Sequence, residues 1–240
     1  MRIAIVSDIH GNLSAFEAVL ADLRLTAPDL IFHGGDLAAG GSSPAEIVDR
    51  IRELGWPGVL GNTDEFLFAP EALKEFAEQA PPQYQPLFAA IGDMAEVTRA
   101  QLGEQRRAWL SRLPRVQLIE SMALVHAKPG DLWRAPAPDA GDEELESAYQ
   151  SLDRPVAVYA HIHRSYIRRT SRLTVVNTGS VSLSYDGDTR AAYLLLDGSE
   201  PEIRRVKYDA DREIESLHRL GMPHAGWIAS ALRTGAFQMP

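Results

Sequence analysis

The 240-residue chain contains no cysteine. This absence excludes disulfide bonds, zinc–thiolate sites and cysteine nucleophiles, and it is typical of an intracellular protein. No run approaches the roughly 18 apolar residues of a membrane-spanning helix. The N-terminal residues enter a strand pattern at once, without the architecture of a signal peptide. We therefore expect a cytoplasmic protein that does not bind a membrane.

Basic residues are also scarce, with 24 Lys and Arg against 33 Asp and Glu and a net charge of −9. This balance disfavours nonspecific binding to a nucleic-acid backbone, and no basic track indicates a nuclease. Bound divalent cations would offset part of the negative charge locally. Hydrophobic residues make up 45% of the chain, which supports a full core, and the length suits one large α/β domain or two small ones.

The first segment that carries chemistry is the apolar run 3–6 with the polar residues after it. Such a run is typical of a strand buried on both faces, predicted here over residues 2–7, and a helical pattern follows over 13–25. Asp8 and His10 would lie at the carboxyl end of this strand, where open α/β sheets place ligand sites. The two-residue period of a strand would point both side chains the same way.

The same arrangement recurs twice along the chain. A short apolar strand at 30–32 precedes Asp36, and another at 58–60 precedes Asn62. A strand, a helix and a strand in sequence predict a βαβ unit with parallel strands. Asp36 should therefore reach the same sheet edge as Asp8.

The rest of the chain mixes helical and strand patterns. Residues 65–113 are predicted to be helical, broken by prolines, and to form a cap-like insertion over the site, with aromatic residues that are more typical of core. Further strands are predicted over 116–119, 122–125, 156–159, 173–176, 191–196 and 203–208, and further helices over 45–54, 142–152 and 209–220. We expect residues 1–240 to form a single domain with a peripheral tail at about 209–240. In that tail, exposed Met222, Trp227 and Phe237 would be an interface in a homo-oligomer.

Seven residues of metal-ligand type follow predicted strands: Asp8, His10, Asp36, Asn62, His126, His161 and His163. Imidazole nitrogens together with carboxylate and amide oxygens suit first-row divalent metals. Seven ligands exceed what one tetrahedral site uses, so the set favours two ions about 3.5–4 Å apart with a bridging carboxylate. Asp36 is the expected bridge because its strand neighbours that of Asp8.

The ordered set Asp8-x-His10, Gly35-Asp36, Gly61-Asn62, His126 and His161-x-His163 resembles the calcineurin-like metallophosphoesterases, over residues 1 to about 207. The likeness is greatest to their small single-domain bacterial and archaeal phosphodiesterase-like branch. The resemblance implies a four-layer α/β/β/α sandwich of two mixed sheets flanked by helices. It also implies that one metal is held by Asp8, His10, Asp36 and His163, and the second by Asp36, Asn62, His126 and His161. The two divalent ions would be manganese, iron, zinc, nickel or cobalt.

One position departs from the family pattern. Many members have a histidine after the asparagine, thought to protonate the leaving group or hold the phosphate, whereas this chain has Thr63. Threonine cannot act as a general acid near neutral pH, and the loss of the acid matters most for poor leaving groups. Asp64 is expected to orient Asn62 or a histidine, and His10 would otherwise help to protonate the leaving group. The candidate catalytic residues are thus Asp36, Asn62, Asp64 and His10.

Substrate contacts are expected from Asn62, Thr63, Ser180 and Arg134. The segment 177–180 resembles an Asn-Pro-Gly-Ser turn of the branch, with threonine in place of proline, so its N–H groups and Ser180 would face the site. Alternatively, its glycine only supplies a positive φ. Three arginines are either phosphate contacts or surface charges: Arg134, Arg164 and Arg168.

These observations predict a metal-dependent phosphoester hydrolase that uses a dinuclear site and a metal-bound hydroxide for in-line attack. We expect a phosphodiesterase that prefers diesters or nucleotide-like substrates. A phosphomonoesterase, of the protein phosphatase or dinucleoside-polyphosphate hydrolase type, is the alternative within enzymes. Thr63 motivates a third possibility, a weakly active metal-binding scaffold. The expected partner is a phosphoester substrate, with no specific nucleic-acid binding.

Overall fold

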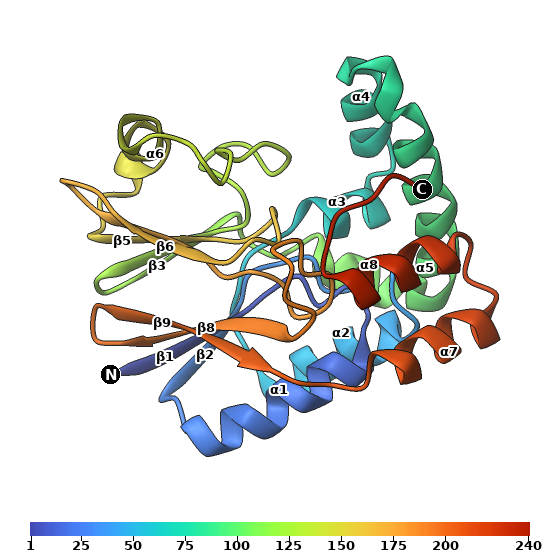
Figure 1. Ribbon diagram of the computed structural model, residues 1–240, viewed down its shortest axis with the longest axis horizontal. Coiled ribbons are helices and arrows are strands. Elements are labelled where there is room, and N and C mark those ends of the chain that lie inside the picture. The colour runs from blue at the N-terminus through green and yellow to red at the C-terminus, as the bar shows by residue number, and fades with distance from the viewer.

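The computed structural model describes residues 1–240 and contains two β-sheets (Figure 1). The first sheet consists, in spatial order, of β2 (Leu30–His33), β1 (Arg2–Val6), β8 (Ala191–Asp197) and β9 (Glu200–Val206). The second consists of β3 (Val116–Ile119), β4 (Met122–Val125), β5 (Val156–Tyr159), β7 (Thr174–Asn177) and β6 (Tyr166–Arg169). The pairs β1–β2, β4–β5 and β5–β7 are parallel and the others are antiparallel. Both sheets are therefore mixed.

Helices cover the outer faces of the stacked sheets and gather at one end of them (Figure 1). Two helices, α1 (Leu13–Thr26) and α2 (Pro44–Leu54), pack on the first sheet, and α6 (Asp142–Tyr149) with the 3₁₀ turn η2 (Gln150–Leu152) packs on the second. The end of the sandwich carries α3 (Asn62–Phe68), α4 (Glu71–Gln79), η1 (Pro82–Tyr84), α5 (Gln85–Leu110), α7 (Ala210–Leu220) and α8 (Ala225–Thr234). The predicted four-layer α/β/β/α sandwich is confirmed.

The first strand shows why residues 3–6 are all apolar. Ile3 and Ile5 point between the sheets, where they pack with Val158 of β5. Ala4 and Val6 point to the opposite face and pack against the helices. Burial of one large aliphatic side chain contributes roughly 1.5–3 kcal/mol, so both faces of this strand stabilise the fold.

Two strand predictions differ from the structure. Residues 58–60 form no strand, because only Gly58 makes a bridge to His33, and the Leu60 N–H turns instead to the Pro114 carbonyl. The strand β6 was not predicted. Its residues are half-buried or exposed and two of them are arginines, so this edge strand lacks the apolar run that indicates a buried one.

Residues 65–113 are helical as predicted and contain most of α3 together with α4 and α5, with a break in α5 at Gly103, where φ is 66°. The C-terminal segment differs from the expected peripheral tail. There, α7 and α8 share a buried cluster with Met94 of α5, and Met222 is only 4% exposed, so Met222 offers no surface for an interface. No helix combines the length and apolar composition that crossing a membrane requires.

Candidate active site

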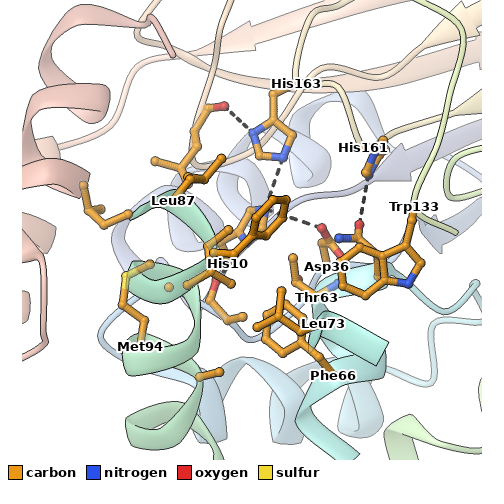
Figure 2. Close-up of a pocket in the computed structure, with 18 of the residues that line it drawn as sticks. His10, Asp36, Thr63, Phe66, Leu73, Leu87, Met94, Trp133, His161 and His163 are labelled. Carbon is orange, nitrogen blue, oxygen red and sulfur yellow. Dashed lines mark hydrogen bonds and ion pairs between the residues drawn. The ribbon is translucent and has the colours of Figure 1, made fainter. Parts of the chain in front are cut away.

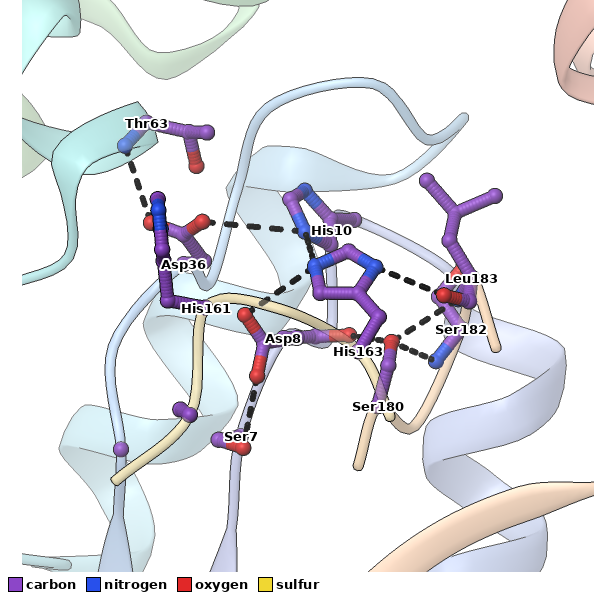
Figure 3. Close-up of polar contacts among 12 residues, drawn as sticks. Ser7, Asp8, His10, Asp36, Thr63, His161, His163, Ser180, Ser182 and Leu183 are labelled. Atoms are coloured by element: carbon purple, nitrogen blue, oxygen red, sulfur yellow. Dashed lines mark hydrogen bonds and ion pairs between the residues drawn. The ribbon is translucent and has the colours of Figure 1, made fainter. Parts of the chain in front are cut away.

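The structure brings all seven predicted ligands together beyond the carboxyl ends of the strands. Nε2 of His163 lies 3.2 Å from Nε2 of His10 and 3.2 Å from Oδ1 of Asp8 (Figure 3). Oδ2 of Asp36 lies 3.8 Å from Nε2 of His10. These four side chains are buried, and their ligand atoms all lie within 4.8 Å of one another, so they could hold a metal ion.

The remaining three ligands form a second group that shares Asp36. Oδ1 of Asn62 lies 2.9 Å from Nε2 of His126 and 2.9 Å from Nδ1 of His161. Nε2 of His126 also lies 3.4 Å from Oδ2 of Asp36. The Asp36 carboxylate therefore stands between the two groups.

The backbone delivers these ligands by left-handed turns. The strand β1 ends at Val6, and Asp8 and His10 follow it with φ values of 53° and 48°. The prediction that strand alternation aligns them was therefore wrong. Three further ligands share positive φ values: Asp36, His161 and His163. Such conformations cost of order 1–3 kcal/mol each and cluster at functional sites.

Hydrogen bonds and glycines hold these turns together. The N–H groups of Asp8 and His10 donate to the carbonyls of Gly35 and Asp36, each at 3.0 Å. A Cβ at Gly61 would collide with the Asp36 carboxylate, and one at Gly35 would lie 2.6 Å from the Gly61 nitrogen. Glycine is therefore required where the second and third ligand loops approach each other.

Three imidazoles are fixed by the protein backbone. Nδ1 of His10 lies 2.8 Å from the Ala39 carbonyl, and Nδ1 of His126 lies 2.8 Å from the Gly34 carbonyl. Nδ1 of His163 lies 2.6 Å from the carbonyl of Leu183 (Figure 3). Because a carbonyl only accepts, each Nδ1 carries the hydrogen, and in the neutral ring Nε2 presents its lone pair to the centre of the site.

This arrangement leaves acceptors facing one another. The Nε2 lone pairs of His10 and His163 meet at 3.2 Å. Oδ2 of Asp8 accepts from the Ser7 hydroxyl at 2.8 Å, but its buried Oδ1 has no hydrogen-bond partner. Buried acceptors without donors are costly, whereas a divalent cation between them would satisfy all three. The residues present therefore fit a metal ion.

The charges of the site differ between its histidines. Burial lowers the pKa of His10 and lowers the pKa of His161 to about 4. Burial also opposes a charge on His126, but the adjacent Asp36 carboxylate prevails and raises the pKa of His126 to about 9. The metal-free protein thus keeps a proton on His126 at neutral pH, which a metal ion bound there would have to displace.

Asp64 makes no hydrogen bond to the side chain of Asn62 or of a histidine, which the sequence suggested that it would orient. Its Oδ1 accepts from the Leu37 N–H at 3.0 Å, and its side chain is fully buried. Burial and the Asp36 charge raise the pKa of Asp64 to about 7. Asp64 therefore anchors the loop that follows Asp36.

Two predicted substrate contacts lie elsewhere. Ser180 is fully buried; its hydroxyl donates to the Asp8 carbonyl at 2.9 Å and accepts from the Leu183 N–H at 2.9 Å. Ser180 therefore supports the Asp8 backbone rather than facing a substrate. Arg134 donates to the Gln79 side chain at 2.9 Å and lies 4.9 Å from the Phe76 ring centroid, outside the residues that line the site's cavity.

Of the other predicted substrate contacts, two lie away from the cavity and two line it. Arg168 donates to Asp142 at 3.1 Å, and Arg164 is exposed, and neither lines the cavity. Asn62 and Thr63 do line it, and the Thr63 N–H donates to Oδ1 of Asp36 at 2.9 Å (Figure 3). Thr63 thus helps to fix the central carboxylate.

A cavity of about 350 Å³ opens beside the ligands (Figure 2). Its floor includes five of them: His10, Asp36, Asn62, His161 and His163. Fifteen of its 22 lining residues are hydrophobic and none is Lys or Arg. The aromatic part of this wall consists of Phe66, Phe76, Phe88, Trp133, Tyr185, Trp227 and Phe237. The sequence placed Phe66, Phe76 and Phe88 in the insertion over the site but favoured a core role for them, and it suggested an interface for Trp227 and Phe237.

Comparison with known proteins places this geometry in a family. Residues 1–200 match the family model described as the calcineurin-like phosphoesterase superfamily domain. The chain is 27% identical over 253 residues to an uncharacterized protein of Methanocaldococcus jannaschii, and the match covers 97% of this chain and 98% of that protein.

Two solved structures share the whole fold. A metallophosphoesterase from Sphaerobacter thermophilus is 24% identical with a TM-score of 0.78, and the match covers 98% of this chain and 99% of that one. A hypothetical protein from Pyrococcus horikoshii OT3 is 17% identical with a TM-score of 0.83, and 99% of each chain is covered. The chain belongs to the calcineurin-like phosphoesterase superfamily and is a metal-dependent hydrolase of phosphoester bonds.

Proposed function

We propose that this metallophosphoesterase binds two divalent ions and hydrolyses phosphodiesters. Asp8, His10 and His163 would hold one ion, Asn62, His126 and His161 the other, and Asp36 both. The observation that carries the first ion is the set of buried acceptors that face one another, above all the two Nε2 atoms of His10 and His163 at 3.2 Å. The second ion is supported by Oδ2 of Asp36, which lies 3.8 Å from His10 and 3.4 Å from His126. Manganese, iron, zinc, nickel and cobalt all suit these ligands.

The residues prepare the site before any ion or substrate arrives. When bound, the two ions offset phosphoryl charge and lower the pKa of a water molecule for in-line attack on phosphorus. The Thr63 N–H fixes Oδ1 of Asp36, which leaves Oδ2 toward His10 and His126. The three hydrogen bonds from Nδ1 to carbonyls fix the imidazole planes. The ligands therefore need little reorganisation on binding.

Two features favour diesters over monoesters. No Lys or Arg lines the cavity, so nothing but the metal ions would offset the second negative charge of a monoester. Thr63 lines the cavity where a proton donor would serve a poor leaving group, and threonine cannot act as that acid near neutral pH. The site therefore suits singly charged esters with good leaving groups.

A substrate panel tests the proposal. The metal-stripped protein would be assayed after addition of each of the five metals, with bis(p-nitrophenyl) phosphate, p-nitrophenyl phosphate, glycerol phosphate, a phosphopeptide and a dinucleoside polyphosphate. We expect the aryl diester to be cleaved fastest. Faster cleavage of a monoester or the polyphosphate would contradict diester preference, and full metal occupancy without turnover would identify a scaffold.

A further inference from the structure

The apolar residues that line the cavity, here called the cavity wall, have no role in the metal binding and hydrolysis proposed above. It comes from α3, α4, α5 and α8 and from the segments that carry Trp133, Tyr185 and Phe237. Figure 2 shows Leu87 and Met94 of α5 on one side of the pocket and Trp133 with Phe66 on another, with His161 and His163 beside them. A group attached to phosphorus at the metal site would therefore enter an apolar space.

The polar atoms of the two wall tryptophans are already satisfied. Nε1 of Trp133 donates to Glu65 at 2.8 Å, and Nε1 of Trp227 donates to the Gln238 carbonyl at 2.8 Å. The wall contains no amide, carboxylate, Lys or Arg side chain, and the polar side chains that line the cavity are those of the floor together with Tyr185. A nucleobase or ribose placed here would leave most of its donors and acceptors unpaired.

The aromatic wall is also arranged before binding. Phe76 stacks on Trp133 with ring centroids 4.8 Å apart and contacts Phe88 edge-on at 5.7 Å. Phe237 meets Tyr185 edge-on at 5.5 Å. Because rigid aromatic walls lose little conformational freedom on binding, they favour a rigid or extended hydrocarbon.

The C-terminal residues fix Phe237 at the cavity. The Gln238 carbonyl accepts from Trp227, and its side-chain oxygen accepts from the Ser230 hydroxyl at 2.7 Å. The Gly187 N–H donates to the Gly235 carbonyl at 2.9 Å. These bonds on both sides of Phe237 make it a wall residue, although its side chain is 43% exposed.

We propose that the cavity binds a hydrocarbon group of the substrate, an alkyl chain or an aryl ring, and so selects lipid-like or aryl phosphodiesters over nucleotides. The inference rests on the proposed phosphodiesterase function and names its substrate class. Transfer of a hydrocarbon group from water into the cavity is favourable in free energy, in proportion to the apolar area buried, and the group needs no hydrogen-bond partners there. Phe237 is the specificity-determining residue at the rim.

A series of diesters with one leaving group tests this directly. Each substrate carries p-nitrophenol as the leaving group, and the second ester group is methyl, hexyl, phenyl or 5′-thymidyl. We expect kcat/KM to be at least about tenfold higher for the hexyl or phenyl ester than for the methyl and thymidyl esters, chiefly through KM. Preference for hexyl assigns an alkyl chain, and preference for phenyl assigns a ring. Equal rates across the series, or a preference for thymidyl, would overturn the inference.

Matched variants locate the effect. Phe237→Ala should reduce the hexyl-to-methyl or phenyl-to-methyl ratio about threefold or more. Met239→Ala, with the same 43% exposure two residues away and outside the cavity, should leave the ratio unchanged. An unaltered ratio in Phe237→Ala would contradict its role.

A binding measurement separates this inference from the proposed function. Calorimetric titration of the metal-loaded protein with hexylphosphonate, phenylphosphonate and methylphosphonate needs no turnover. Tighter binding of hexylphosphonate or phenylphosphonate by about tenfold supports the cavity's role even if no diester is cleaved. Equal affinities for all three would refute it even if diesters are cleaved.

Discussion

The cluster of seven candidate metal ligands and the cavity wall meet at one place but are built differently. The ligands come from loops beyond strands of both sheets, and five have positive φ. Directional hydrogen bonds to backbone carbonyls orient three of them, His10, His126 and His163. The wall comes mainly from helices packed at the end of the sandwich and carries no charged side chain. The positions of the candidate ligands are thus set by the main chain. In the proposed account, substrate selectivity depends instead on side-chain packing in the wall, which can change without moving a ligand.

The largest effect should come from breaking the cluster at its centre. Asp36→Asn keeps the shape of the side chain but removes the shared charge, and we expect metal-dependent diesterase activity to fall by about 10³-fold or more. The fold should survive, which circular dichroism would verify. Asp64→Asn is the matched control, because its amide oxygen can still accept from Leu37, and it should lose less than about tenfold. Near-normal turnover in Asp36→Asn would refute the bridging assignment.

A smaller disturbance should reach the cluster through the backbone. In Gly61→Ala the added Cβ would collide with the Asp36 carboxylate, so the ligand has to move. We expect metal affinity to fall about 10–100-fold, the range seen when groups that support metal ligands are lost. Gly92→Ala, where no atom lies within 4 Å of the new Cβ, serves as the control. Equal metal affinities in the two variants would show that the close approach is unimportant.

Position 63, where many family members have a histidine and this chain has Thr63, allows protonation of the leaving group to be tested separately from substrate selectivity. Thr63 lines the cavity, and its hydroxyl has no hydrogen-bond partner. We expect Thr63→His to raise kcat for alkyl diesters by roughly tenfold while changing kcat for p-nitrophenyl esters little, because only poor leaving groups need the proton. The ratio of the two kcat values is the measurement. A uniform change for both ester classes would indicate altered binding rather than an added acid.

The subtlest effect concerns protons. The pKa of His126 is raised to about 9 in the metal-free protein, above the ordinary value of 6.5. This protonation stabilises the metal-free fold fully below pH 6.5 and is lost as pH rises through 9. A bound metal needs the neutral ring, so its apparent affinity should rise by up to about tenfold per pH unit between these values.

Calorimetry in buffers of different ionisation enthalpy would measure the release of about one proton per protein molecule, from His126, when both sites fill at pH 7.5. Asp64 is a second possible source of this proton, because its pKa is about 7. If His126 is the source, the Asp64→Asn variant should keep most of the proton release. A release that vanishes in Asp64→Asn would assign the proton to Asp64 instead of His126.

The two regions also differ in how far the sequence predicted them. Each ligand follows an apolar segment within about four residues, so Asp8, Asp36 and His126 were identifiable from order alone. The left-handed turns that aim them were not, because glycine spacing does not reveal which neighbouring residues take a positive φ. The loop that carries Asn62 was predicted, although the strand expected before it consists only of the bridge between Gly58 and His33.

The cavity wall could not be predicted because the same residue types also form core. Phe66 is 2% exposed and packs in the core, yet it also lines the cavity, while Tyr84 of the same insertion is 39% exposed and does not line the cavity. Only the packing of α4 and α5 decides these roles. The same holds for Trp227 and Phe237, which the sequence suggested for an interface and which line the cavity.

Anomalous diffraction from crystals of the manganese-loaded protein tests the central claim most directly. The account predicts two peaks about 3.5–4 Å apart, one among Asp8, His10 and His163 and one among Asn62, His126 and His161, with Asp36 in contact with both. A single peak in crystals of protein that is fully active would contradict it.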